Sequence, residues 1–425
     1  MEVTYANTDI GIFAADWDIK IIAQLFDKGF QNGVFYEVDR KGKGVPIVNV
    51  SDLYGNIPIV THSLEKFNAT ESEINRFLVR KGDLFFTRSS VVPTGIAMCN
   101  VYDGDDEDHA VFDSHVIKLS VDQHKINSLF LCLQCRMPYS RRFFIANSKT
   151  AIMTTIDQKS LAKCPIPIPS LPEQNDIVET LRQFDTYIEN LAELIEKKRG
   201  IRDGALEDLM RGRTRLEGFN KEWITYPFKQ YFSLLPTNTC SRDQLSDRGA
   251  VGDIHYGDVL IKYGSVLSDD DEIPRLKDVS KIKERSYLQT HDILIADTAE
   301  DETVGKVVQI GKVSIPIVGG LHTVACRPNF ETAEGFLGYY MNSSIYHDQL
   351  YPYITGIKVS SVSKKSFGET ELCIPADIDE QKAIVSVLRD MDEEIKALET
   401  ERDKMIQIRE GAMDDLLTGR VRLRV

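Results

Sequence analysis

Several groups of side chains have residue types that could perform metal or acid–base chemistry. Cys132 and Cys135 have the C-x-x-C spacing of many zinc and redox sites. No second cysteine pair exists in the sequence to complete a zinc site, and apolar spacing around both residues predicts a helix. We therefore expect buried structural thiols. The acidic run at 103–108 lacks the sixth-position glycine of a calcium loop, so we expect a solvated turn there.

Two further groups could belong to a catalytic site. The segment from Asp377 to Lys382 contains the carboxylates and the lysine that a metal-dependent nuclease uses. The same segment can cap a helix, and a similar cap with serine occurs in the other half of the chain, so we expect a cap. His115 and His322 have no nucleophile or second ligand near them in the sequence, and we expect both to pack within strands. The sequence therefore predicts no metal site.

Common motifs for catalysis on nucleic acids do not occur in the sequence. It contains no Asn/Asp-Pro-Pro-aromatic tetrapeptide for amino-group methylation. It also contains no phosphate-binding loop, because Gly305 and Gly311-Lys312 have the wrong spacing and Val313 follows. We expect no catalytic residue and no cofactor in this chain.

The composition is that of an ordinary globular chain with a negative net charge. Its 425 residues suffice for two or three domains. The net charge of −14 argues against a nonspecific, strongly basic DNA binder, although 51 lysines and arginines can form local basic surfaces. Scattered cysteines, no apolar stretch of membrane-spanning length and an N-terminus without a signal-like pattern predict a cytoplasmic protein that does not cross a membrane.

The sequence is an internal duplication. Residues 173–216 match residues 380–423, 207 positions later, at nearly half of the positions and without a gap. The similarity continues more weakly outside these segments, where Trp17 aligns with Trp223. Each half therefore consists of a divergent region of about 150 residues followed by a well-matched segment of about 45 residues.

The two matched segments are predicted to be long helices. Each begins with a capping box, Ser170 with Glu173 and Asp377 with Glu380, in which the glutamate can reach back to the cap. Each is about 40 residues long, roughly 60 Å at 1.5 Å per residue, and ends in Gly212 or Gly419. Apolar residues alternate three and four apart and form a seam of Ile177, Leu181, Phe184, Ile188, Leu191, Ile384, Leu388, Met391, Ile395 and Leu398.

One such seam alone would most simply bury itself in its own domain. Two equivalent seams predict an antiparallel coiled coil around a pseudo-twofold axis. The divergent regions have the pattern of mixed α/β domains, with strands expected at 46–50, 83–87, 111–119, 258–261, 292–295 and 315–318 and helices near 126–146 and 331–350. The predicted fold is therefore α+β, with two tandem α/β domains at 1–169 and 217–376 and helical spacers at 170–216 and 377–425.

Three short segments, taken in order and with their duplication, resemble a known family. They are the entry Thr8–Gly11 with Asp16-Trp17, the junction Ile166–Pro169 with Pro172–Gln174, and the exit Gly212–Phe219 with Trp223. The second junction keeps Ile374-Pro375 and Glu380-Gln381 but differs between them. These features resemble the specificity subunits of type I restriction–modification enzymes, and the resemblance covers essentially the whole chain.

The resemblance implies a non-catalytic subunit that reads double-stranded DNA. Each of its two target-recognition domains would read one half of a split sequence, and the spacer helices would set the distance between the halves. The implied partners are two methylation subunits, which carry S-adenosylmethionine and methylate adenine, and restriction subunits, which use ATP and magnesium.

Contact with DNA requires lysine and arginine for phosphates and polar side chains for base edges. In the first domain, a glycine-rich basic loop and residues after a strand meet this requirement, and Arg88 could pair with guanine. The candidates are Arg40, Lys41, Lys43, Arg88, Ser89, Ser90, Arg141, Arg142 and Lys149 in the first domain, and Lys358, Ser360, Ser361, Lys364 and Lys365 in the second. Divergence between the domains is expected if they read different half-sites.

Two other functions remain open at the level of sequence. One is a self-contained DNA-modifying or DNA-cleaving enzyme, against which the missing motifs argue. The other is a coiled-coil scaffold with no role on nucleic acid.

Overall fold

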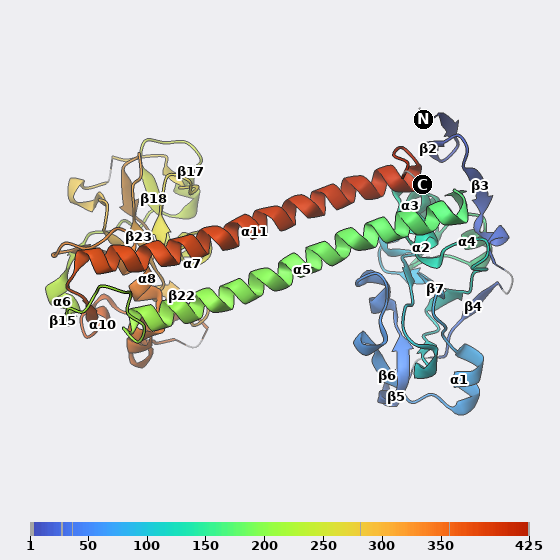
Figure 1. The fold of residues 1–425 in the computed structure, drawn as a ribbon, viewed down its shortest axis with the longest axis horizontal. Helices are drawn as coiled ribbons and strands as arrows, with labels where there is room; N and C mark the ends of the chain where they lie inside the picture. Colours follow the sequence, from blue (N-terminus) through green and yellow to red (C-terminus); the bar gives the residue numbers. More distant parts are fainter. Residues whose placement is uncertain (1–3, 27–28, 36, 281, 357, 424–425) are drawn as a thin grey trace. The chain divides into compact units, whose positions relative to one another are not determined.

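The computed structural model describes residues 4–26, 29–35, 37–280, 282–356 and 358–423. The chain divides into two compact units. Unit 1 comprises residues 1–190 and 401–425, and unit 2 comprises residues 191–400. Two long helices, α5 (Leu171–Met210) and α11 (Ile378–Thr418), each contribute to both units (Figure 1).

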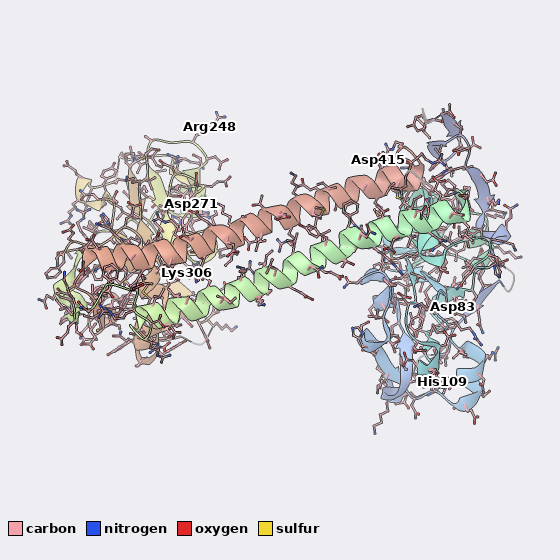
Figure 2. The ribbon with its side chains drawn as sticks, viewed as in Figure 1. Asp83, His109, Arg248, Asp271, Lys306 and Asp415 are labelled. Atoms are coloured by element: carbon pink, nitrogen blue, oxygen red, sulfur yellow. The ribbon has the colours of Figure 1, made fainter. Side chains whose placement is uncertain are left out.

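Unit 1 contains a mixed α/β domain. Its central sheet has the strand order β4–β11–β7–β9, beside the three-stranded sheets β10–β5–β6 and β12–β13–β8 and the two-stranded sheets β14–β3 and β1–β2. Asp83, which Figure 2 labels, is buried directly before β7 and forms an ion pair with Lys118 at 3.3 Å. The strands are β1 (Tyr5–Thr8), β2 (Gly11–Ala14), β3 (Asp18–Ile21), β4 (Phe30–Asn32), β5 (Lys41–Val48), β6 (Glu65–Phe67), β7 (Leu84–Thr87), β8 (Ser89–Ser90), β9 (Cys99–Val101), β10 (Val111–Phe112), β11 (Val116–Leu119), β12 (Lys149–Thr150), β13 (Thr154–Thr155) and β14 (Pro165–Ile168). The shorter helices are α1 (Glu71–Phe77), α2 (Ser128–Arg136), α3 (Pro138–Ala146) and α4 (Gln158–Ala162).

Unit 2 repeats the main features of this domain. Its central sheet has the order β16–β25–β21–β23–β19, beside β17–β20–β18–β24 and the pairs β15–β27 and β22–β26. The strands are β15 (Trp223–Pro227), β16 (Phe232–Leu235), β17 (Leu245–Ser246), β18 (Gly252–Ile254), β19 (Val266–Leu267), β20 (Arg275–Leu276), β21 (Ile293–Ala296), β22 (Thr298–Ala299), β23 (Val307–Ile310), β24 (Ile317–Gly319), β25 (Thr323–Pro328), β26 (Ser360–Ser361) and β27 (Glu371–Pro375). The shorter helices are α6 (Phe228–Tyr231), α7 (Tyr256–Ile261), α8 (Phe336–Asn342), α9 (Ser344–His347) and α10 (Lys364–Phe367).

The ends of the long helices agree with the predicted caps, except for the role of the glutamates. Ser170 Oγ accepts from the Glu173 amide at 3.4 Å, and Gly212 and Gly419 have left-handed φ values of 64° and 70°. The two glutamates do not reach back to their caps as expected. The Glu173 carboxylate accepts from Arg422 and the Glu380 carboxylate from Arg215, because these arginines offer a stronger, charge-assisted interaction.

Four of the predicted seam residues belong to two separate cores. In unit 1, Ile177 and Leu181 of α5 lie in one cluster with Leu416 and Leu417 of α11. In unit 2, Leu206 and Leu209 of α5 share a cluster with Ile384 and Leu388 of α11. The start of each helix thus packs beside the end of the other, so the two helices run antiparallel within each unit. Leu191 is also buried, and the half-buried seam positions are Phe184, Ile188, Met391, Ile395 and Leu398.

The expected fold class is confirmed, but several elements differ from the sequence prediction. Residues 258–261 were expected to form a strand and instead belong to α7, because Asp258 accepts from the His255 amide at the helix start and from Arg242. The expected helix at 126–146 is two helices separated at Met137-Pro138, since proline ends a helix before it. The expected strand at 111–119 is interrupted at 113–115, and the helix near 331–350 is divided into α8, α9 and a 3-10 segment at Asp348–Tyr353.

The expectation for the two histidines was also wrong. His115 is exposed between β10 and β11, and the His322 side chain is 50% exposed, so neither packs within a strand. Among the described residues, no helix is long and apolar enough to cross a membrane.

Candidate nucleic-acid interface

In unit 1, one small sheet brings several of the candidate DNA contacts together. Strand β8, which is Ser89-Ser90, pairs antiparallel with β13, and β13 pairs with β12, which begins at Lys149. Arg88 immediately precedes β8 and follows the buried strand β7. Four candidates from two distant parts of the sequence therefore lie in or directly beside one small sheet.

This surface contains a hollow of about 600 Å³ with cationic and amide side chains on its wall. Gln158 Nε2 donates to Asn32 Oδ1 at 3.2 Å, which orients both amides. Lys149 is 85% exposed and lies 3.9 Å from Asp157, a weak surface contact. The polar lining residues are Arg88, Lys149, Lys159, Asn32, Asn147 and Gln158, together with Thr155 and Asp157. Such a wall offers donors and acceptors suited to phosphates and base edges.

The equivalent surface of unit 2 contains the residues of the second half that were predicted to contact DNA. Strand β26, which is Ser360-Ser361, pairs antiparallel with β22, and Ser361 also bridges to Thr355. Lys358 lies on the exposed turn before β26. Lys364 and Lys365 are exposed in the first turn of α10, which occupies the place that α4 has in unit 1. Four of the unit 1 candidates and the unit 2 candidates thus lie on the same part of the repeated domain, whereas Arg40, Lys41, Lys43, Arg141 and Arg142 lie elsewhere in unit 1.

Sequence reasoning missed Gln158 and Lys159 on the unit 1 surface. Asp157 caps α4 through the Ser160 amide, and Ser363 caps α10 through the Ser366 amide in the same way. The alignment of Lys159-Ser160 with Lys365-Ser366 was the signal that could have found them.

Arg40 has a structural role that differs from the predicted contact with DNA. Its guanidinium donates to Glu73 Oε1 at 3.1 Å and to the Asn68 carbonyl at 2.8 Å, and it lies 4.5 Å from the centre of the Phe67 ring. The hydrogen bond from Arg40 is the main reason why the pKa of Glu73 falls to about 2. The sequence could not reveal this role, because both polar partners lie about 30 residues further along the chain.

The predicted glycine-rich basic loop is a bulged strand. Lys41 and Lys43 belong to β5, which pairs with β6 and shifts register between Lys41 and Val45. Lys41 lies 3.9 Å from Glu65, and both Lys41 and Lys43 are exposed. Gly44 has a φ of 94°, and a Cβ there would lie 2.5 Å from the Phe67 carbonyl oxygen. This glycine therefore serves the close approach of two strands within the domain.

Arg141 also has a structural role. It donates to the carbonyls of Ala97 at 2.6 Å and Thr94 at 3.0 Å, and to that of Ile96. Burial lowers the pKa of its guanidinium. Arg141 thus holds a turn in which Ala97 has a left-handed φ of 49°, while its neighbour Arg142 is exposed on α3.

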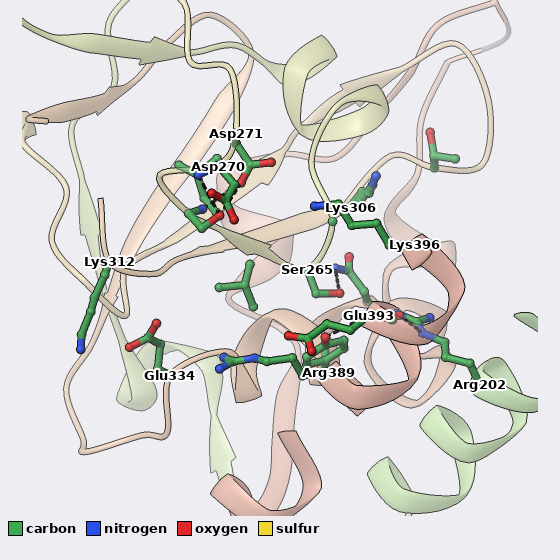
Figure 3. A pocket seen from close by; sticks show the side chains of 18 of the residues that line it. Arg202, Ser265, Asp270, Asp271, Lys306, Lys312, Glu334, Arg389, Glu393 and Lys396 are labelled. Atoms are coloured by element: carbon green, nitrogen blue, oxygen red, sulfur yellow. Dashed lines mark hydrogen bonds and ion pairs between the residues drawn. The ribbon is translucent and has the colours of Figure 1, made fainter. Parts of the chain in front are cut away.

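One hollow of unit 2 has a mixed-charge wall, and its lining residues include none of the candidate DNA contacts. It has a volume of about 950 Å³ and lies beside Arg389, Glu393 and Lys396 of α11 (Figure 3). Lys306 points towards it but donates to the carbonyls of Leu260 and Tyr263, at 2.9 and 3.1 Å. Part of the charge that lines this hollow is therefore already engaged in contacts within the domain.

The cysteines of the C-x-x-C pair are buried in α2, and burial raises the pKa of both thiols. Within the described ranges, no three His, Cys, Asp or Glu side chains are grouped so that they could hold a metal ion.

A repeated α/β domain, each copy packed against an antiparallel pair of long helices, defines a class of duplicated two-domain proteins. The family model described as "Type I restriction modification DNA specificity domain" matches residues 15–197 and again residues 229–407. The chain therefore belongs to the type I restriction–modification DNA specificity family, as a specificity subunit with two target-recognition domains.

Relatives and solved structures agree with this assignment. The chain is 22% identical over 446 residues to the putative type I restriction enzyme MjaX specificity subunit of Methanocaldococcus jannaschii, covering 100% of this chain and 98% of that protein. The fold is similar to the crystal structure of the type I restriction–modification system S subunit from M. genitalium, with a TM-score of 0.50, 16% identity and coverage of 94% and 96%. A chain from a structural study of complex assembly in the type I R-M system gives a TM-score of 0.58 at 13% identity, with coverage of 96% and 99%.

Proposed function

We propose that this chain reads a bipartite DNA target, with one half-site for each target-recognition domain, and that it contributes no catalytic group. The observation that carries the proposal is the placement of the two candidate sets on equivalent surfaces. In unit 1 these are Arg88, Ser89, Ser90 and Lys149, and in unit 2 they are Lys358, Ser360, Ser361, Lys364 and Lys365. Two similar domains with different side chains at one surface suit two different half-sites.

In this proposal the lysines contact phosphates. Lys149 and Lys365 are exposed, and a lysine that neutralises one phosphate contributes to affinity at every sequence. The protein acts in the cytoplasm, where its DNA target lies. The chemistry belongs to its partners: methylation subunits with S-adenosylmethionine and restriction subunits with ATP and magnesium.

The repeated architecture also supports two copies of the methylation subunit. In unit 1 a hollow of about 560 Å³ is lined by Leu171, Asn175 and Arg182 of α5. In unit 2 a hollow of about 660 Å³ is lined by Ile378, Lys382 and Arg389 of α11, the residues 207 positions later. Two equivalent surfaces on one chain can bind two copies of one partner.

Methylation by the reconstituted complex tests the proposal. The chain is combined with its cognate methylation subunits, and adenine methylation is measured on a pool of DNA duplexes. We expect a split motif with two defined halves. Lys149→Ala should lower binding about equally for all sequences and reduce the salt dependence by about one ion, whereas Lys66→Ala, on the exposed side of β6, should not. Methylation without any split motif would contradict the proposal.

An exchange experiment separates this function from that of a scaffold. Replacing residues 17–169 with the corresponding domain of another family member should change one half of the methylated motif and leave the other half unchanged. A scaffold without a role on DNA would give the same motif before and after the exchange.

A further inference from the structure

Arg88 in unit 1 and Asp297 in unit 2 occupy the same structural position. The Arg88 amide donates to the His115 carbonyl at 2.9 Å, and the Asp297 amide donates to the His322 carbonyl at 3.1 Å. The Arg88 carbonyl accepts from Ile156 at 3.1 Å, and the Asp297 carbonyl accepts from Val362 at 2.9 Å. This equivalence is not visible in the sequence, since an arginine aligned with an aspartate is no match.

The backbone at this position is held rigidly in both units. Arg88 directly follows Thr87, the fully buried last residue of β7. Asp297 directly follows Ala296, the fully buried last residue of β21. Each residue then enters the small sheet that carries the candidate DNA contacts. A side chain on such a support is positioned more accurately than one on a free loop.

The two side chains present opposite chemistry at this position. Arg88 is exposed, and among the described residues its guanidinium makes one long contact of 3.4 Å with the Ser114 carbonyl. A guanidinium has five N–H donors and no acceptor. The Asp297 carboxylate is 22% exposed and accepts from Thr298 Oγ1 at 2.9 Å, with His322 Nδ1 at 3.6 Å. A carboxylate offers acceptors only, and these neighbours orient it.

The surroundings suit a base edge in both units. Arg88 lines the hollow with the oriented amides of Asn32 and Gln158, and Lys149 lies on its rim. In unit 2, Lys364 and Lys365 stand at the start of α10, the place that Gln158 and Lys159 have in unit 1. In both units, lysines that can contact phosphates thus accompany the central side chain, which is an arginine in unit 1 and an aspartate in unit 2.

We infer that this position determines specificity in each target-recognition domain. Arg88 donates its two parallel N–H groups to O6 and N7 of a guanine, and Asp297 accepts from the N4 amino group of a cytosine. The two half-sites therefore differ in the type of base read at this position. The inference rests on the proposed function and adds to it the base that each domain reads there.

Base preference measured for single variants tests the inference. The complete complex of the chain with its methylation subunits is assayed on duplexes in which each motif position is varied in turn. Arg88→Ala should reduce discrimination in favour of guanine at one position of one half-site by about 10- to 100-fold, with the other half-site unchanged. Arg88→Lys should also lose discrimination, because lysine keeps the charge but lacks the planar fork. Asp297→Asn should relax the preference for cytosine at one position of the opposite half-site.

Controls distinguish failure of this inference from failure of the proposed function. Arg248→Ala alters an exposed residue of unit 2 that Figure 2 labels, and Asp270→Asn alters another exposed residue of that unit. Both variants should leave every base preference unchanged. Thermal melting of each variant identifies any that fail to fold. If Arg88→Ala fails to fold, the base preference of Arg88→Lys tests the inference instead. If the variants lower methylation equally for all four bases at every position, the inference is wrong while the proposed function stands. If the unaltered complex recognises no split motif, the proposed function itself fails.

Discussion

Arg215 donates two hydrogen bonds to the carboxylate of Glu380, at 2.9 and 2.7 Å. Within unit 1, Arg422 contacts Glu173 in the same way, with both residues displaced by 207 positions. Each arginine follows the end of one long helix, and each glutamate lies in the first turn of the other. Further inside, Arg202 pairs with Asp392 and Arg409 with Asp185. These repeated pairs fix the antiparallel helices within each unit.

Removing Arg215 should destabilise unit 2. The Glu380 side chain is 1% exposed, so Arg215→Ala leaves a buried carboxylate without its cationic partner. We expect a loss of about 3 kcal/mol in the free energy of unfolding, measured with denaturant. Arg213→Ala is the control, since Arg213 is 66% exposed and lies 3.8 Å from Asp208, and it should change stability by less than about 0.5 kcal/mol. Equal effects of the two variants would show that the buried pair has no special role.

The Arg40–Glu73 pair should make unit 1 sensitive to acid. Its hydrogen bonds lower the pKa of Glu73 from 4.5 to about 2. A depressed carboxyl pKa stabilises the fold fully above the unfolded value, and this stabilisation is lost as pH falls from about 4.5 towards 2. Arg40→Ala should therefore reduce stability at pH 7 and show a smaller further loss between pH 5 and pH 3. Denaturant unfolding across this range measures both effects.

The same variant separates the structural role of Arg40 from contact with DNA. The methylated motif and its salt dependence should be unchanged in Arg40→Ala at a temperature where the domain remains folded. A changed base preference would instead indicate that Arg40 contacts DNA.

The two helix-side hollows should bind one methylation subunit each. Arg182 is 49% exposed and Arg389 is exposed, so charge reversal at either site alters the surface without removing a buried group. Arg182→Glu or Arg389→Glu alone should leave one methylation subunit on the chain, and the double variant should leave none. Native mass spectrometry counts the copies, with Lys404→Glu, on the exposed side of α11, as the control. If the double variant still bound both methylation subunits, these subunits would have to bind at another surface of the chain.

The length of the paired helices should set the spacing of the half-sites. One heptad inserted after Glu193 in α5 and another after Thr400 in α11, at equivalent positions of the repeat, would lengthen each helix by about 10 Å. Because DNA rises about 3.4 Å per base pair, the methylated motif should gain about three base pairs in its spacer with unchanged halves. An unchanged spacer would refute a measuring role for the helices.

The long helices could be predicted because their signals are local. Ser170 and Gly212 mark the ends of α5 in the sequence itself, and the apolar spacing identifies the buried side. The segment at 258–261 was misassigned because its apolar residues have strand propensity, while Asp258 and its partner Arg242 favour a helix start. That ion pair depends on tertiary structure.

The candidate site was only partly predictable for the same reason. Arg40 and Arg141 have the residue type of a DNA contact, but their partners at Glu73 and Thr94 are brought near only by folding. Asp297 was missed because it is acidic, and its equivalence to Arg88 is expressed in backbone hydrogen bonds. Composition can identify cations, whereas a position that reads bases is defined by the fold around it.

The methylome of the host with and without this gene tests the central claim most directly. Sequencing that detects methylated adenine should find a split motif with two defined halves in cells that carry the gene, and the motif should lose its methylation when the gene is deleted. An identical set of methylated adenines in both strains, with the methylation subunits present, would contradict the claim that this chain selects the DNA target.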